Sequence, residues 1–117
     1  MSAPVKDTVS FDDFDKLDIR CGRITHLEVV PKSKKLVAFT ISFGDFERTI
    51  VSAMQEDRDD WAELTGRQCL CLVNLAPRKM AGIASQGMIL EVGYDDGVHP
   101  LPLVVPEWEV PDGARLS

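Results

Sequence analysis

The stretch LVAFTISFGDFERTIVSAM, which covers residues 36–54, decides the fold of this chain of 117 residues. In residues 36–43 a large apolar side chain occupies every second position, and this period of two is typical of a strand with one buried face. A tight-turn signal, Gly44-Asp45, comes next, and residues 48–54 form a second strand-like run. The stretch therefore predicts an antiparallel hairpin.

Three further apolar runs outside this hairpin have the length of strands: residues 19–29, 67–75 and 87–92. Between the hairpin and the second of these runs, residues 55–64 carry acidic side chains at the start and apolar ones on one face. This pattern predicts a short helix that stops at Gly66. The last apolar stretch, residues 98–105, contains two prolines, so we predict an edge strand or an extended arm there.

Five short strands with one helix between the third and the fourth follow the order of an OB-fold barrel. We therefore predict an all-β protein, a five-stranded OB-fold barrel with one short helix between strands 3 and 4 and a C-terminal extension. The chain has the length of one compact domain. Residues 1–10 are predicted to be an N-terminal tail, and residues 11–117 to be the single domain with its extension.

Positive charge is concentrated in two parts of a chain that is acidic overall, with 13 Lys and Arg against 19 Asp and Glu. Residues 66–90, for example, contain three basic residues and no acidic one. In an OB-fold, ligands bind over strands 2 and 3, between the loops that join strands 1 to 2 and 4 to 5. We predict these loops at residues 30–35 and 76–86. Their basic residues are Lys32, Lys34, Lys35, Arg78 and Lys79, which predicts a groove for an anionic partner.

The sequence argues against several other classes of protein and site. No apolar run approaches the roughly 18 to 20 residues that span a bilayer, and the N-terminus lacks the apolar core of a signal peptide. We therefore expect no membrane partner and a cytoplasmic location. The three cysteines, Cys21, Cys69 and Cys71, lie in apolar runs, which indicates buried thiols and no metal site. His26 and His99 have no neighbouring nucleophile, so neither an enzyme nor a cofactor is expected.

Three motifs occur along the chain: LDIRCGRI at residues 17–24, RTIVS at residues 48–52, and NLAPRKMAGIASQGMIL at residues 74–90. In their order and spacing the chain resembles the tRNA-binding domain family. That family includes the C-terminal domain of bacterial methionyl-tRNA synthetases, the cytokine-precursor-like domains of synthetase cofactors, and the free-standing CsaA secretion chaperones. The resemblance covers residues 11–116. It implies an OB-fold with C-terminal extensions, a homodimer, and recognition of tRNA by its shape and backbone charge.

The resemblance also implies which residues contact RNA. The matching positions are Ser52, Asn74, Arg78, Lys79, Met80, Ser85, Gln86 and Met88. The charge pattern adds Lys32, Lys34 and Lys35 to these predicted contacts. Arg48 is added because it lies on a predicted strand, where it could contact backbone or ribose groups of the RNA. The chain departs from the family at Ala76, where synthetase-appended members usually have lysine, and at Ala53, where they usually have glycine. The missing lysine lowers the positive charge of the predicted site.

Several of these residues also have a structural interpretation. Asn74 is a residue type that commonly ends a strand in a turn. Ser85 and Gln86 either read a base edge or tie the loop down. Met88 is predicted to pack in the core, although it could also lie under a base.

The function and the surplus aromatic residues leave alternatives as well. A CsaA-like export chaperone, which binds unfolded secretory precursor polypeptides, is the alternative to a tRNA-binding protein. Phe11, Phe14 and the apolar tail of residues 101–108 exceed what a small barrel needs. They either cover a partner subunit or pack against the open side of their own barrel.

Overall fold

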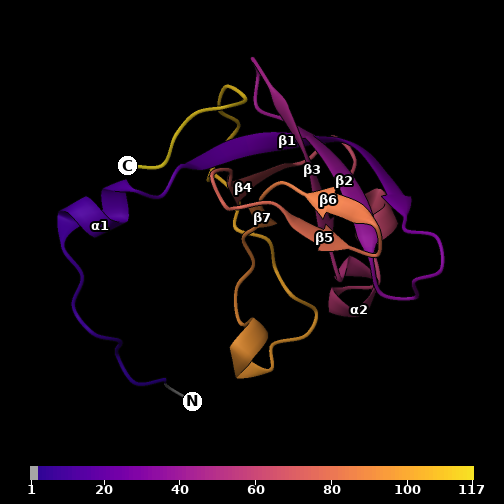
Figure 1. Cartoon of the computed structure of the whole chain (residues 1–117), viewed down its shortest axis with the longest axis horizontal. Coiled ribbons are helices and arrows are strands. Elements are labelled where there is room, and N and C mark those ends of the chain that lie inside the picture. The colour runs from indigo at the N-terminus through magenta and orange to yellow at the C-terminus, as the bar shows by residue number, and fades with distance from the viewer. Residues whose placement is uncertain (1–2) are drawn as a thin grey trace.

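The computed structural model describes residues 3–117 and shows a five-stranded antiparallel sheet that is nearly closed into a barrel (Figure 1). Its strands, in the order β3-β2-β1-β4-β7, are β1 (Ile19–Val29), β2 (Val37–Ser42), β3 (Glu47–Ser52), β4 (Gln68–Leu72) and β7 (Met88–Ile89). The prediction of an all-β, OB-like barrel is confirmed. Within residues 3–117, no helix is both long enough and apolar enough to cross a membrane.

The predicted hairpin is formed by β2 and β3, and it supplies the centre of the core. Phe39 pairs with Ile50, and both side chains are buried. At the turn the Phe43 N–H donates to the Phe46 carbonyl over 2.8 Å. Each fully buried apolar side chain of this kind contributes about 1.5–3 kcal/mol. The period of two in the sequence therefore corresponds to one face of each strand that points into the barrel.

β1 is the longest strand, with 11 residues, and it pairs with both β2 and β4. Its register shifts between Ile24 and His26, and a bulge of this kind bends a strand and increases its twist. Earlier in the strand, a Cβ on Gly22 would come within 2.5 Å of the Ile41 and Phe43 side chains. The bend and the glycine together allow one strand to serve both halves of the barrel.

The single helix predicted for residues 55–64 is wrong in its continuity, because the segment forms two short helices. These are α2 (Met54–Asp57) and η1 (Trp61–Glu63). Between them the backbone of Arg58 is extended, with φ −162° and ψ 150°. The Arg58 guanidinium donates to Asp60 over 2.6 Å, so a local ion pair takes the place of a continuous helix.

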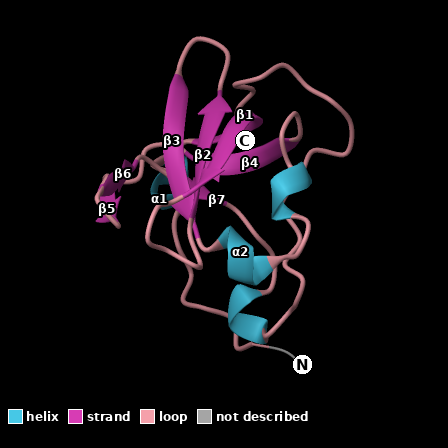
Figure 2. Cartoon of the chain, turned by 90° about the vertical axis from the view of Figure 1, so that its right-hand side faces the viewer, coloured by secondary structure: helices cyan, strands magenta, loops and turns pink. Residues whose placement is uncertain are grey.

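The segment predicted as the loop of residues 76–86 contains a small hairpin of its own, made of β5 (Arg78–Met80) and β6 (Ile83–Ser85). Its turn is Ala81-Gly82, and both residues have positive φ angles, 50° and 85°. Two successive left-handed residues are typical of a type I′ turn. Figure 2 shows this hairpin on the β3 side of the sheet.

Both ends of the chain extend beyond the barrel. α1 (Phe11–Asp15) begins where the Ser10 hydroxyl accepts the Asp13 N–H over 3.1 Å. After η2 (Tyr94–Asp96), residues 98–105 run as an extended arm, as one of the two alternatives predicted. Leu103 of this arm is buried against the core, so the arm covers part of the barrel.

Candidate nucleic-acid interface

The β5–β6 hairpin is fastened to the edge of β3, and this contact helps to close the barrel. The Ser85 hydroxyl accepts the Val51 N–H over 2.9 Å. Gln86 makes two bonds to Thr49: its N–H donates to the Thr49 carbonyl over 2.8 Å, and its Oε1 accepts the Thr49 N–H over 2.9 Å. Ser85 is buried and Gln86 is exposed. Of their two interpretations, the structure therefore provides the one in which they tie the segment down.

The fastened hairpin carries the basic pair on its outer strand. Arg78 lies across from Ser85 in the ladder, and Lys79 lies across from Ala84. Both basic side chains are exposed. Within the described part of the chain, neither forms an ion pair with a carboxylate. Two uncompensated positive charges therefore stand on a strand whose neighbour is bonded to the barrel.

The lysine loop, residues 30–35, is organised differently. Its turn is held by Ser33, whose hydroxyl accepts the N–H groups of Lys35 and Leu36 over 3.2 and 3.0 Å. Lys32 has a φ of 66°, in the left-handed region. Lys35 lies 3.7 Å from a carboxylate oxygen of Glu56, in an exposed ion pair. The loop is therefore bonded to itself, and one of its three charges has a nearby counter-ion.

A small apolar cluster joins the hairpin to the lysine loop. Val30 and Leu36, at the two ends of the loop, share this cluster with Met80 and Ile83, which flank the hairpin turn. The buried Val51 of β3 lies in the same cluster. The structure therefore brings together the two basic segments that are distant in the sequence. Their basic residues are Lys32, Lys34, Lys35, Arg78 and Lys79.

Two other predicted contact residues lie elsewhere and take part in structural contacts. The Arg48 guanidinium stands 4.6 Å from the centre of the Phe46 ring, a cation–π contact. Asn74 is exposed, and both the oxygen and the nitrogen of its side-chain amide bond to the backbone of the N-terminal segment. Its Oδ1 accepts the Asp18 N–H over 2.9 Å, and its Nδ2 donates to the Lys16 carbonyl over 2.8 Å.

A hollow of about 290 Å³ adjoins the hairpin. It is lined by five of the predicted residues, Ser52, Arg78, Met80, Ser85 and Met88, and also by Glu91 and Tyr94, which were not predicted from the sequence. The prediction that Met88 packs in the core is wrong, because its side chain is 44% exposed. It points outward because Ile89, its neighbour on the short β7 strand, takes the inward face. The sequence signal for Glu91 is a single carboxylate at the end of an apolar run.

Glu91 has an unusual environment beside this hollow. Its Oε2 atom is buried and has no hydrogen-bond partner in the described structure. Burial and the charge of the neighbouring Asp57 together raise the pKa of Glu91 to about 7. Asp57, at the end of α2, is itself only 7% exposed. Below about pH 7, Glu91 therefore keeps a proton that an exposed glutamic acid would release.

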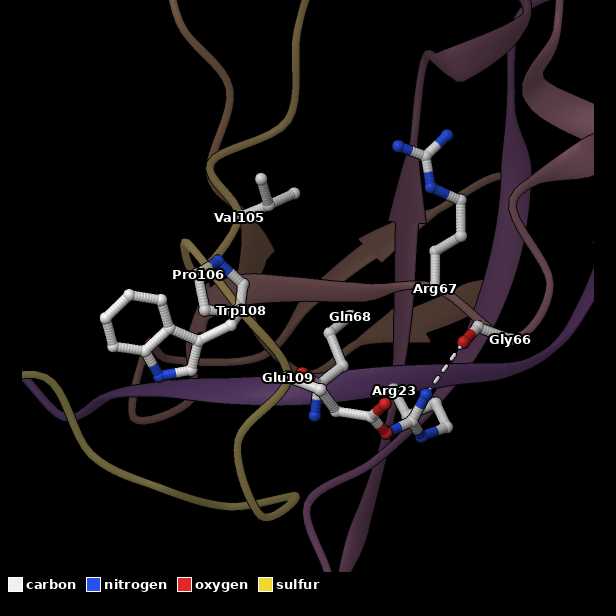
Figure 3. A pocket seen from close by; sticks show the side chains of 8 residues that line it. All are labelled: Arg23, Gly66, Arg67, Gln68, Val105, Pro106, Trp108 and Glu109. Carbon is white, nitrogen blue, oxygen red and sulfur yellow. Dashed lines mark hydrogen bonds and ion pairs between the residues drawn. The ribbon is translucent and has the colours of Figure 1, made fainter.

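A second hollow lies under the C-terminal strap, residues 105–113, at a different place on the sheet (Figure 3). Arg23 of β1 donates to the Gly66 carbonyl over 2.9 Å and pairs with Glu109 of the strap. Trp108 stands at the other end of this hollow and is 70% exposed. The strap thus neutralises Arg23, whereas Arg67, which also lines this hollow, forms no ion pair within residues 3–117.

Comparison with known proteins places the chain in a family. The model of the putative tRNA binding domain matches residues 19–115. The methionine–tRNA ligase of Parabacteroides distasonis is 43% identical over 114 residues, which are 97% of this chain and 16% of that protein. The corresponding ligase of Cytophaga hutchinsonii is 49% identical over 114 residues, with the same two coverages. The chain thus spans about a sixth of the length of the curated relatives it matches.

Solved structures agree with this assignment. The MetRS related protein of Pyrococcus horikoshii superposes with a TM-score of 0.84 at 32% identity, covering 96% of this chain and all of that one. The chaperone CsaA of Bacillus anthracis superposes with a TM-score of 0.77 at 27% identity, covering 95% of this chain and all of that one. The family match spans most of the chain, and it includes both basic segments. The chain therefore belongs to the tRNA-binding domain family.

Proposed function

We propose that this protein binds tRNA through the face formed by the β5–β6 hairpin and the lysine loop, and that it recognises tRNA by shape and backbone charge. The observation that carries this proposal is the exposed pair Arg78 and Lys79, which forms no ion pair within residues 3–117, on a strand fastened to the barrel. Cations that neutralise phosphates release counter-ions, which favours binding to any nucleic-acid backbone. A tRNA-binding role would place the protein in the cytoplasm.

The predicted contact residues then divide into three groups. Arg78, Lys79 and the lysines of the loop contact phosphates. Ser85 and Gln86 act indirectly, because they hold the hairpin that presents the charges. Arg48 contributes at the edge of the footprint, where its guanidinium reaches sugar or phosphate oxygens. Asn74 acts there indirectly, because both ends of its amide hold the N-terminal segment.

The test is tRNA affinity measured over a range of salt concentrations. The double variant Arg78→Ala/Lys79→Ala should lose about tenfold or more in affinity, and its salt slope should fall by about 2 because two phosphate contacts are removed. A matched control is Lys6→Ala/Arg67→Ala, which removes one lysine and one arginine from exposed positions outside this face. If both double variants bind equally well, the charged hairpin is not the tRNA site.

We also propose a homodimer, with the N-terminal segment and the C-terminus in the interface. Phe11 is 76% exposed, Leu17 48% and Leu116 47%. These three residues line one hollow of about 620 Å³, which a second copy would fill. Sedimentation equilibrium of Phe11→Ser/Leu17→Ser should show a weaker dimer. An unchanged association constant would place the interface elsewhere.

A second candidate function is that of an export chaperone that binds unfolded precursor polypeptides. The mainly apolar hollow beside the hairpin supports it, as does the likeness to CsaA chaperones. Suppression of aggregation of an unfolded substrate tests it. Activity that resists both salt and competing tRNA would favour the chaperone over the tRNA-binding function.

A further inference from the structure

The hollow beside the hairpin combines three features that one ligand would satisfy together. Met88 and Tyr94 present apolar and aromatic surface, and they are 44% and 72% exposed. Arg78, without a counter-ion in the described chain, lies among the lining residues. An aromatic ring, an apolar side chain and a cation in one hollow can stack on, pack against and neutralise parts of the same ligand.

The lining of this hollow also contains a polar group that an apolar ligand would not use. Glu91 lines it, and its carboxyl group is partly buried with a raised pKa. A carboxyl group can accept a hydrogen bond and, when protonated, donate one, so a ligand with a polar edge is favoured there. Ser52 adds a hydroxyl to the same lining. The occupant should therefore have a flat apolar body and a polar edge.

An unstacked nucleobase has this combination of properties, and its own phosphate supplies the negative charge. Bases in RNA loops and at RNA ends are recognised by stacking on aromatic side chains and by hydrogen bonds at their edges. The side chain of an unfolded polypeptide would match the apolar surface, but an aliphatic or phenyl group would satisfy neither Arg78 nor Glu91. Charge and hydrogen-bonding complementarity thus favour RNA.

We propose that this hollow is a subsite for one unpaired nucleobase of a bound RNA. The base packs against Met88 and Tyr94, its polar edge bonds to Glu91, and its phosphate is held by Arg78. This inference rests on the proposed tRNA-binding function and deepens it. It adds a preference for RNA with unpaired bases to an interface otherwise governed by backbone charge.

The experiment compares two RNAs that bind the full-length protein. One is a stem–loop with 2-aminopurine in its loop, and the other is a fully paired duplex of the same length. Wild type should prefer the stem–loop, and Tyr94→Leu should lower only stem–loop affinity, by about 5-fold to 100-fold, the range that stacking on an aromatic side chain provides. Trp108→Leu is the matched control, because Trp108 is 70% exposed but lies in the other hollow. It should leave the preference intact.

Glu91→Leu tests the hydrogen bond separately. This variant keeps roughly the bulk of the side chain and removes its polar group, and its thermal unfolding is measured to check that it folds. We expect it to lower stem–loop affinity several-fold and to leave duplex affinity unchanged. If Tyr94→Leu and Glu91→Leu both retain the wild-type ratio of stem–loop to duplex affinity, the subsite does not exist.

The two proposals fail in distinguishable ways. If wild type binds both RNAs and Arg78→Ala/Lys79→Ala weakens both, the tRNA-binding proposal stands whatever the Tyr94 variant does. If an unfolded polypeptide displaces 2-aminopurine RNA from wild type and binds Tyr94→Leu poorly, the hollow holds an apolar side chain and the nucleobase subsite is overturned.

Discussion

The hairpin β5–β6 and the lysine loop both carry basic residues, but the fold supports them in different ways. The hairpin is bonded to β3 through Ser85 and Gln86, whereas the turn of the loop is held by its own Ser33. Charges on a fastened strand lose less conformational entropy on binding than charges on a loop. We therefore expect Arg78 and Lys79 of the hairpin to contribute more to tRNA affinity per charge than the three lysines of the loop.

The largest difference between the two segments is expected when the hydrogen bond that fastens the hairpin to β3 is removed. Ser85→Ala leaves the Val51 N–H buried without its acceptor, which costs about 1–3 kcal/mol. Urea unfolding should show this loss, and tRNA affinity should fall although no charge has changed. Ser33→Ala is the matched control in the loop, where water can replace the hydroxyl. Equal losses of stability in the two variants would contradict the distinction between a fastened and a self-supported segment.

The pH dependence of stability should report the carboxyl pair beside the hairpin hollow. The pKa of Glu91 is raised from 4.5 to about 7 in the folded protein, so the folded state binds more protons than the unfolded state between these values. Stability should therefore fall as pH rises from about 4.5 through about 7. Asp57 and Arg58 are the charged groups that act on Glu91, and Arg78 and Tyr94 line the same hollow.

Glu91→Gln should remove this part of the pH dependence, because the amide does not titrate. Thermal or urea unfolding of both proteins at pH 5, 6, 7 and 8 measures it. If the free energy of unfolding of the wild type rises with pH in parallel with that of the variant across this window, Glu91 is ionised in the folded protein.

Removing the charges of the loop should have a smaller effect than removing those of the hairpin. Lys32→Ala/Lys34→Ala/Lys35→Ala takes away three charges, yet we expect it to weaken tRNA binding by only about threefold to tenfold, because exposed and flexible lysines make weak contacts. Filter binding at several salt concentrations compares it with Arg78→Ala/Lys79→Ala. A greater loss for the triple variant would transfer the main site to the loop.

The smallest expected effect comes from the turn of the hairpin. Ala81 has a φ of 50°, and a left-handed conformation costs an L-residue about 1–2 kcal/mol. Ala81→Asn creates the Asn-Gly pair that a type I′ turn favours, so it should raise the melting temperature by a few degrees. tRNA affinity should stay the same or rise slightly. A lower melting temperature would mean that the turn is not strained at Ala81.

The strands of the sheet could be predicted because their signals are local. The alternation in residues 36–43 and the Gly44-Asp45 turn identify the first hairpin without any knowledge of the rest of the chain. The second hairpin was missed because Ala81-Gly82 is a weak turn signal and its strands have three residues each. The helix of residues 55–64 divides at Arg58, where an ion pair with Asp60 competes with helical bonding.

The site could be predicted in its charges but not in its supports. Arg78 and Lys79 stand out as the basic pair of a segment without acidic residues, and they are exposed in the structure. Nothing in the sequence shows that Ser85 bonds to Val51, because those residues are 34 positions apart. Glu91 and Tyr94 were missed because their meaning depends on the hollow that they line together with Arg78.

The sequence by itself determined the period of the strands, the position of the first hairpin, the family and the two basic segments, since each of these is carried by neighbouring residues or by a motif. The tertiary structure alone decided that the two segments meet through Val30 and Met80, that Met88 points outward, and that a carboxyl pair lies beside the hairpin. The physical reason is distance along the chain: contacts and burial depend on barrel closure, which brings together residues that local patterns cannot relate.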